Sequence, residues 1–327
     1  MSDFNQPDIS AYRPRFSQIA TMMRLPLAER LDDLDIAFVG VPYDMGTFFR
    51  PGARSGPAQI REMSRLLRKV HPATRVAPFE LCQVADVGDT PVNPMNVEAS
   101  LERITEFFRD LAAEGVAPIA LGGDHTIPVP ILRGLKRGGA FDRPLGMIHV
   151  DAHADVLSAD GDAFDGIEVN HGTFVRLAVE EGLVDPGRTV QIGLRGSQWS
   201  EDANKFAADA GIRMIYQHEF DALGIDAVTE EIRRVVGAGQ TYFTIDVDGL
   251  DPTCCPGTGH PEPGGLTMRE MHAIMRACRG LDIIGGDVSE VSPPLDPSGM
   301  TALCAAHLLF EILCLTAEAT ARRKGRI

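Results

Sequence analysis

Short, nearly continuous apolar runs separated by helical patterns constrain the fold of this chain more than any other feature of its sequence. Parallel strands are buried on both faces and read as such runs, whereas antiparallel strands commonly alternate apolar and polar residues. Strands that alternate with helices predict a parallel sheet covered on both faces. The predicted strands are residues 34–44, 82–89, 117–123, 145–150, 189–196, 212–219, 241–248 and 282–291. Helical patterns lie at about 57–67, 97–114, 172–182, 201–210, 222–237, 268–279 and 301–319, and a further helix begins near residue 126.

Length and composition indicate one soluble domain. The chain has 327 residues, of which 44% are hydrophobic and 24% are charged, and it contains no linker, repeat or low-complexity tract. We therefore expect a single domain at 33–327, preceded by an irregular arm at 1–32. The formal net charge of −15 argues against nucleic acid as a partner.

The ends of the chain and its cysteines favour a reducing, cytoplasmic location. The polar start lacks the apolar core of a secretory signal, and no run approaches the length of a membrane span. The six cysteines form no CxxC pair and no zinc-ribbon spacing. The vicinal pair Cys254–Cys255 favours packing in a loop over redox chemistry.

The stretch GMIHVDAHAD, residues 146–155, carries the first sign of chemistry. In extended backbone, alternate side chains point to one face, so Asp151, His153 and Asp155 would project together. Two carboxylates and an imidazole at the end of a buried strand are costly to bury unless a cation neutralises them. A divalent metal is the natural candidate, and the alternative is a polar strand end bonded to loop backbone.

Unusual polar residues also follow three other predicted strands. His125 comes after 117–123, Asp246 and Asp248 end 241–248, and Glu290 ends 282–291. Each alone could be a loop or capping residue. Because ligand sites in parallel sheets form at the carboxyl ends of the strands, we expect these side chains to meet at one edge.

Together these strand ends supply two imidazoles and four carboxylates. The candidate metal ligands are His125, Asp151, His153, Asp155, Asp246 and Asp248. The negative charges of four carboxylates formally cancel the positive charges of two divalent cations. An oxygen-rich set with two imidazoles and no thiolate suits Mn²⁺ best, with Ni²⁺, Co²⁺ or Fe²⁺ as alternatives. Two such metals about 3.5–4 Å apart could generate and orient hydroxide near neutral pH.

Six motifs in order resemble the ureohydrolase family, which includes arginase, agmatinase and the guanidino-acid hydrolases. They are GGDHT (122–126), DAHAD (151–155), HGT (171–173), TIDVDGLDP (244–252), PGTGHPEPGGLT (256–267) and DVSEVSPP (287–294). The resemblance covers about residues 34–319. It implies a three-layer α/β/α sandwich with a mostly parallel eight-stranded sheet, a dinuclear metal centre, and hydrolysis of a guanidinium group to urea and an amine.

The resemblance also implies a role for each matching residue. One metal would be held by His125, Asp151, Asp155 and Asp246, and the other by His153, Asp151, Asp246 and Asp248. Asp151 and Asp246 would then bridge the two metals, and Asp155 would also accept a hydrogen bond from the hydroxide. Glu290 matches the carboxylate that grips the guanidinium, and His171 matches the histidine proposed to shuttle protons to the leaving amine. The family commonly forms trimers or hexamers, so we expect a homotrimer or homohexamer, with a hetero-oligomer containing a paralogous subunit as the alternative.

The residues that would contact the substrate tail leave more than one class of substrate open. The loop 156–170 carries four acids and no Lys or Arg; the acids are Asp160, Asp162, Asp165 and Glu168. They favour a cationic or neutral tail, as in agmatine or a biguanide, unless they only solvate a surface loop. The alternative substrates carry a carboxylate, as guanidinobutyrate and guanidinopropionate do.

One position departs from the family pattern. His260 stands in PGTGHP where the family usually has Thr, and an imidazole at the metal rim would reshape the pocket or add a polar contact. Cys254–Cys255 precede it in the same loop. Arg50, on another loop expected at the rim, is the basic residue that could accommodate a carboxylate tail.

Two rival functions share the expected fold. Single-zinc deacetylases use an Asp-His-Asp set, but they have no use for His125 and Asp248. A catalytically silent subunit would need neither the full ligand set nor Glu290 and His171. We therefore expect a metal-dependent amidinohydrolase.

Overall fold

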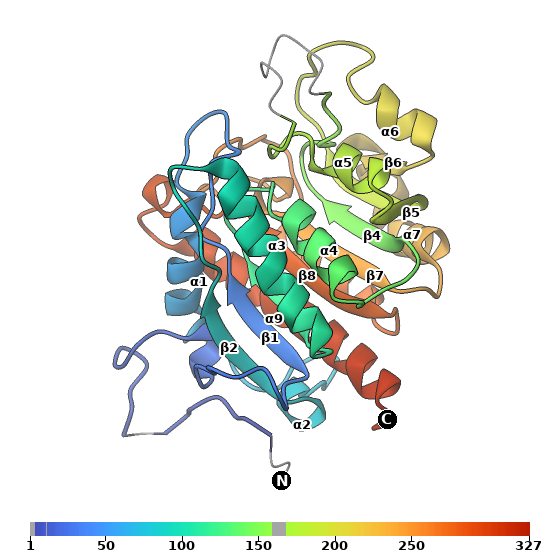
Figure 1. Cartoon of the computed structure of the whole chain (residues 1–327). Helices are drawn as coiled ribbons and strands as arrows, with labels where there is room; N and C mark the ends of the chain where they lie inside the picture. Colours follow the sequence, from blue (N-terminus) through green and yellow to red (C-terminus); the bar gives the residue numbers. More distant parts are fainter. Residues whose placement is uncertain (1–3, 11, 159–167) are drawn as a thin grey trace.

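The computed structural model describes residues 4–10, 12–158 and 168–327, and its centre is an eight-stranded sheet (Figure 1). The strand order is β2-β1-β3-β8-β7-β4-β5-β6, and every neighbouring pair is parallel. The strands are β1 (Ile36–Gly40), β2 (Val84–Asp89), β3 (Ala117–Leu121), β4 (Leu145–Val150), β5 (Val184–Leu194), β6 (Arg213–Tyr216), β7 (Thr241–Asp246) and β8 (Ile283–Ser289).

Helices cover both faces of the sheet, so the expected three-layer α/β/α sandwich is confirmed (Figure 1). The helices are α1 (Gly56–Ser64), α2 (Pro78–Leu81), α3 (Val97–Ala113), α4 (Pro128–Arg137), α5 (Phe174–Glu180), α6 (Lys205–Ala210), α7 (Gln217–Val236), α8 (Met268–Ala277) and α9 (Met300–Arg323). Short 3₁₀ turns lie at Met22–Arg24, Ala53–Ser55, Val247–Gly249 and Pro293–Leu295.

Alternate residues of each strand feed two separate cores. In β1, Ile36 and Phe38 belong to the core that contains residues of α1, α8 and α9, whereas Ala37 and Val39 belong to the core that contains residues of α3 and α4. Every residue of β1 is buried. This burial on both faces is the physical reason why the strands read as continuous apolar runs.

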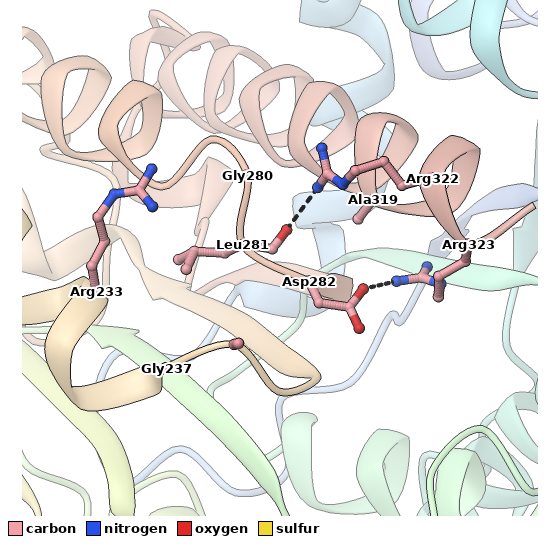
Figure 2. Close-up of a pocket in the computed structure, with 9 residues that line it drawn as sticks. Arg233, Gly237, Gly280, Leu281, Asp282, Ala319, Arg322 and Arg323 are labelled. Carbon is pink, nitrogen blue, oxygen red and sulfur yellow. Dashed lines mark hydrogen bonds and ion pairs between the residues drawn. The ribbon is translucent and has the colours of Figure 1, made fainter. Parts of the chain in front are cut away.

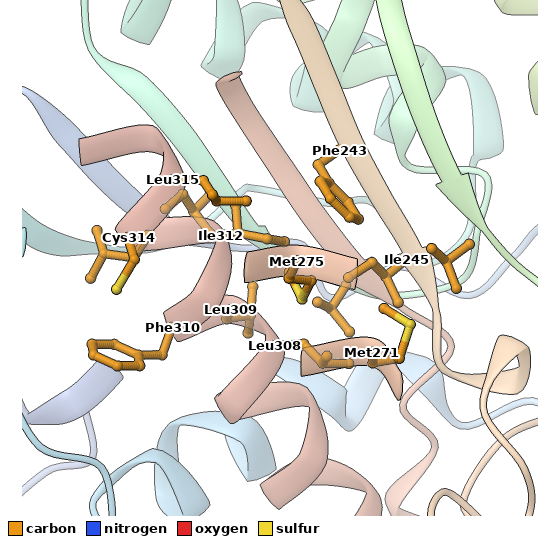
Figure 3. Packing of buried hydrophobic residues seen from close by; sticks show 14 of the residues in the cluster. Phe243, Ile245, Met271, Met275, Leu308, Leu309, Phe310, Ile312, Cys314 and Leu315 are labelled. Atoms are coloured by element: carbon orange, nitrogen blue, oxygen red, sulfur yellow. The ribbon is translucent and has the colours of Figure 1, made fainter. Parts of the chain in front are cut away.

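The longest helix, α9, lies within the core. Leu308, Leu309 and Ile312 of α9 pack near Met271 of α8 and Phe243 of β7 (Figure 3). The helix is long and apolar enough to cross a membrane by length and composition, which differs from the expectation that no run approaches that length. Because 83% of its most apolar window is buried inside the protein, its apolar character is that of a core helix.

Two local features differ from the sequence-based expectation. The segment 212–219 is strand only at β6, and α7 begins at Gln217, because the apolar run is interrupted there by polar residues that start a helix. The short helix α2 was not expected from periodicity, since four residues carry too little of a helical pattern. The division between an arm at 1–32 and a domain at 33–327 stays a prediction, although Met22 and Met23 of the arm are buried in the core.

A buried ion pair ties α1 to the end of β2. Arg61 donates from Nε to Asp86 Oδ2 at 2.8 Å and from Nη2 to Asp86 Oδ1 at 3.0 Å. The Asp86 side chain is fully buried, and Asp86 also accepts from the backbone N–H of Met22 at 2.6 Å. One paired arginine therefore neutralises the carboxylate that anchors the arm.

We expect Arg61→Ala to lower the free energy of unfolding by about 3–5 kcal/mol, because it leaves Asp86 buried without its cation. Denaturant midpoints at one fixed protein concentration would measure this loss. Arg137→Ala removes an exposed pair with Glu102 and serves as the control, with an expected change of about 0–1 kcal/mol. Equal effects of the two substitutions would contradict the prediction.

Candidate metal centre

Four loops at the carboxyl edge of the sheet bring the predicted site residues together. They follow β3, β4, β7 and β8, which are neighbours in the order β3-β8-β7-β4. The register pairs Val150 of β4 with Ile245 of β7. The acids that follow these two strands therefore begin at the same height along the sheet. The convergence that strand periodicity predicted is therefore present.

A first group of side chains surrounds His125. Its Nδ1 lies 2.9 Å from Asp151 Oδ2, 3.3 Å from Asp155 Oδ2 and 3.4 Å from Asp246 Oδ2. The His125 side chain is fully buried, and the three carboxylates are at most 9% exposed. One nitrogen thus faces three carboxylates with almost no water.

A second group lies on the other side of Asp151. His153 Nδ1 lies 3.1 Å from Asp248 Oδ2 and 3.4 Å from Asp151 Oδ1. Among the described residues, clusters with metal-ligand spacing occur in just two places, and both contain Asp151. The two oxygens of Asp151 therefore face different groups.

Hydrogen bonds behind His125 fix which of its nitrogens faces the carboxylates. His125 Nε2 lies 2.8 Å from Thr244 Oγ1, and Thr244 Oγ1 donates to Asp287 Oδ1 at 3.0 Å. Because the hydroxyl donates to the carboxylate, it accepts from His125 Nε2–H. The lone pair of Nδ1 is then free for a cation, as in metal sites whose histidines are oriented by outer partners.

His171 and Glu290 form a pair beside these groups. His171 Nδ1 lies 3.0 Å from Glu290 Oε1, which also accepts from the backbone N–H of His125 at 2.9 Å. The Phe48 ring packs edge-on against His171 at a centroid distance of 4.3 Å. Asp155 and Glu290 have φ of 50° and 63°, the left-handed region that non-glycine residues rarely adopt. Such backbone conformations cluster at functional sites because the surrounding structure must hold them.

A cavity of about 350 Å³ opens over the two groups. Its inner wall includes His153, Asp155, Asp246, Asp248 and His171. Its outer wall is formed by Phe48, Leu157, Leu194, Arg195, Ser197, Gln198, Trp199, Asn204, His260 and Glu262. The cavity therefore connects the predicted metal ligands with a mouth of mixed apolar and polar character.

The predicted tail-recognition residues are only partly described. Asp160, Asp162 and Asp165 lie outside the described residues, and Glu168 is exposed and does not line the cavity. His260 does line it, with its ring centroid 4.9 Å from that of His171. Burial, followed by the charge on His171, lowers the pKa of His260 to about 4. Arg50 is partly buried near His260 but is not part of the cavity lining.

Sequence reasoning missed two buried polar residues next to the ligands. His149 Nε2 lies 2.9 Å from Asp151 Oδ2, and Gln191 reaches His149 from β5. A histidine in an apolar strand gives no signal by itself. The signal available was its spacing, since residues 149, 151 and 153 alternate onto one face.

A second and larger cavity lies at the opposite, amino-terminal edge of the sheet (Figure 2). Its arginines already serve the ends of helices: Arg233 donates to the carbonyls of Ala277 and Arg279, and Arg322 donates to the carbonyl of Leu281. Basic residues at helix carboxyl termini are a common structural device. This cavity therefore gives no reason to place chemistry there.

Comparisons with known proteins agree with this geometry. Residues 34–315 match the Arginase family model. The chain is 50% identical to the guanidinopropionase of Pseudomonas aeruginosa over 321 residues, which cover 98% of this chain and 99% of that protein. It is 44% identical to the mitochondrial agmatinase of Gallus gallus, across 96% of this chain and 90% of that protein. Among solved structures, the proclavaminate amidino hydrolase from Streptomyces clavuligerus matches with a TM-score of 0.87 and 36% identity, covering 94% of this chain and 99% of that chain.

The chain belongs to the arginase family. The resemblance found in the sequence motifs is therefore confirmed, and the protein is a hydrolase of guanidino compounds. The substrate is unresolved between the alternatives that the sequence left open.

The electrostatics of this arginase-family site fit divalent cations. Burial raises the pKa of Asp246 well above its usual value and that of Asp248 to about 6, and the neighbouring carboxylates add to both shifts. Burial and the Asp151 charge likewise raise the pKa of Asp155. Carboxylates this close and this dry resist ionisation together unless a cation joins them. Oxygen and imidazole donors of this number suit two divalent metals.

Protons should compete with metal at this site. Below about pH 6 Asp248 holds a proton that a cation must displace, so affinity should fall about tenfold per pH unit for each displaced proton. We expect titration calorimetry with Mn²⁺ to show two metals per chain at pH 7.5 and much weaker binding at pH 5. The melting temperature should also rise more on adding Mn²⁺ at pH 7.5 than at pH 5. One metal per chain would favour the deacetylase alternative, and none would favour the silent subunit.

Proposed function

We propose that this arginase-family hydrolase cleaves short guanidino acids, of the guanidinopropionate or guanidinobutyrate type, to urea and an ω-amino acid. The observation that carries this choice is Arg195 in the outer wall of the cavity. All of its hydrogen bonds go to backbone carbonyls, those of Gly193, Asp248, Gly249, Leu250 and Glu262. Among the described residues no carboxylate forms an ion pair with its guanidinium, although Asp248, Asp151 and Glu262 act on it through their charge, so a substrate carboxylate could supply that pair.

Similarity to relatives supports the same choice. The guanidinopropionase of Pseudomonas aeruginosa shares more identity with this chain than the agmatinase of Gallus gallus does. The acids that favoured a cationic tail lie mainly outside the described residues, so that expectation stays a prediction. Ser197 and Gln198 add neutral donors to the wall beside Arg195.

Agmatine is the second candidate, and Glu262 is the observation that favours it. The Glu262 carboxylate lies over Gly196, at the mouth of the same cavity. A cationic tail could pair with it, and a carboxylate tail would be repelled. The two candidates therefore predict opposite effects of removing this one charge.

The proposed assignment of metal ligands follows the two groups around Asp151. His125, Asp151, Asp155 and Asp246 would hold one cation, and His153, Asp151, Asp246 and Asp248 would hold the other. When bound, two divalent cations lower the pKa of water and so supply the nucleophile near neutral pH. The donor set suits Mn²⁺ best, with Ni²⁺ as the alternative.

The chain's own residues would bind and orient the substrate. Glu290 lies behind His171 of the cavity wall and would accept hydrogen bonds from the guanidinium in a fixed plane. Its contact with His171 already engages Oε1, which leaves Oε2 for this purpose. Burial of the pair excludes water from the reacting carbon and strengthens these contacts.

His171 would supply the proton to the departing amine. Burial alone would lower the pKa of His171, but the hydrogen bond and charge of Glu290 outweigh burial and raise it. With Nδ1 donating to Glu290, Nε2 is the nitrogen that can carry a proton to the leaving group. A raised pKa keeps that proton available near neutral pH.

Assembly and location complete the proposal. We infer a homotrimer or homohexamer from the family alone, with a hetero-oligomer as the alternative. All six cysteines are free thiols, which is typical of a reducing compartment, so we infer a cytoplasmic location.

A urea-release screen tests the substrate. With Mn²⁺ present, we expect kcat/KM for guanidinopropionate or guanidinobutyrate to exceed that for agmatine, arginine and biguanides by at least about tenfold, or about 1.4 kcal/mol. Glu262→Gln should then raise kcat/KM for the guanidino acids and leave agmatine unimproved. A preference for agmatine that Glu262→Gln weakens would overturn the guanidino-acid proposal and support the second candidate.

Asp248→Ala tests the second metal. We expect the fold to survive, because Asp248 follows a strand instead of packing in a core, and urea release to fall by at least about 10³-fold. Circular dichroism and steady-state rates with the best substrate would measure both. Asp110→Ala, an exposed acid on α3, is the control and should leave the rate unchanged. Full activity of Asp248→Ala would rule out a mechanism that needs two metals.

A further inference from the structure

His149 lies where a metal ligand would lie, but its hydrogen bonds keep it from binding a metal. It lies in β4, is fully buried, and falls within the first cluster with His125, Asp151 and Asp155. Its Nε2 is 2.9 Å from Asp151 Oδ2. Residue type and distance alone would make it a third imidazole for a cation, so its tautomer decides its role.

Gln191 determines that tautomer. Gln191 lies directly beside His149 on β5, and its Nε2 is 2.9 Å from His149 Nδ1 and 2.7 Å from the carbonyl oxygen of Ala154. A carbonyl can only accept, so the group facing Ala154 must be the amide N–H₂. Turning the amide over would place two oxygens 2.7 Å apart in a dry site. His149 Nδ1 therefore accepts from Gln191, and Nε2 carries the proton.

A protonated Nε2 donates to Asp151 and cannot bind a metal. Asp151 Oδ2 accepts this hydrogen bond while facing His125, and Asp151 Oδ1 accepts from the backbone N–H of His153 at 2.6 Å. One bond at each oxygen fixes the plane of the carboxylate. Asp151 is the residue that both clusters contain, so this plane sets how the two halves of the site are joined.

The imidazole of His149 is also held in place by packing. Its ring lies edge-on to Phe174 at a centroid distance of 5.2 Å and next to His125 at 5.1 Å. The ring cannot swing toward a cation without breaking both hydrogen bonds and this contact. Packing and hydrogen bonding thus require the same orientation.

We propose that His149, oriented by Gln191, is a positioning residue that fixes the Asp151 carboxylate between the two halves of the metal centre and is not itself a ligand. The inference rests on the two-metal centre proposed above. Outer partners of this kind change metal affinity or activity by about 10–100-fold when removed.

His149→Phe is the direct test, because phenylalanine keeps the ring packing and removes both hydrogen bonds. We expect the variant still to bind two Mn²⁺ per chain at saturation, but with affinity about 10–100-fold weaker by titration calorimetry. The EPR spectrum of an exchange-coupled Mn²⁺ pair should weaken at metal concentrations that saturate the wild type. At saturating Mn²⁺, kcat should fall while KM changes little.

Gln191→Met provides a second measurement if His149→Phe fails to fold. It removes the donor to Nδ1 and should weaken Mn²⁺ binding in the same direction, by less than His149→Phe. His272→Phe is the matched control, since it removes a histidine–glutamate contact of 2.7 Å between α8 and α9 that belongs to neither cluster. Its Mn²⁺ affinity should equal that of the wild type.

Each other outcome overturns the inference in a recognisable way. Binding of one Mn²⁺ at saturation by His149→Phe would show that His149 is a ligand, and unchanged affinity in His149→Phe and Gln191→Met would show that it positions nothing. A wild type that binds no Mn²⁺ would refute the centre itself and this role with it. A wild type that binds two Mn²⁺ but releases no urea from any guanidino compound would contradict only the proposed function.

Discussion

Mutual repulsion among buried carboxylates at one edge of the sheet is the constraint on which the rest of this structure depends. Asp151, Asp155, Asp246 and Asp248 are nearly dry, and burial raises the pKa of three of them. For Asp151, burial is outweighed by the imidazoles of His125, His149 and His153 around its carboxylate, which hold its pKa well below the usual range. The protein itself therefore keeps Asp151 ionised, whereas burial and neighbouring charge oppose ionisation of the other three acids. Asp151 is also the acid that both clusters contain.

The parallel sheet allows the fold to remain stable despite this concentration of charge. The loops after the strands place the acids around shared histidines, while the strands behind them are buried on both faces. Strand register, as in the pairing of Val150 with Ile245, sets where these loops begin. Stability from two large cores offsets the local cost, which is the usual arrangement when strain and charge are concentrated at a functional site.

Strand periodicity predicted the inner site well and the outer site poorly, for physical reasons. The meeting of Asp151, His153 and Asp155 was predicted, but β4 ends at Val150 and the three converge through a bent loop with left-handed backbone at Asp155, not through extended alternation. The sheet itself could be predicted from continuous apolar runs. His149 could not, because its role depends on Gln191 in a neighbouring strand, and pairing between β4 and β5 cannot be read from either segment alone. The mouth could not either: the sequence singled out Arg50 as the basic residue at the rim, whereas Arg195 lines the cavity, with its guanidinium held by carbonyls from three separate segments. Long-range partners, which local patterns do not encode, decide both cases.

The left-handed backbone at Asp155 and Glu290 extends this reasoning from the fold to the chemistry. Glycine would relieve the strain at either position, which amounts to about 1–3 kcal/mol each, but it would remove the carboxylate that the site needs there. Glu290 directly follows β8 and Asp155 lies in the loop after β4, and regular extended backbone at either would direct its carboxylate elsewhere. Glu290 Oε1 is held instead between His171 Nδ1 and the backbone N–H of His125. Glu290 thus contacts both His171, which lines the cavity, and the backbone of His125 in the first cluster, so a shift of either residue would move its carboxylate.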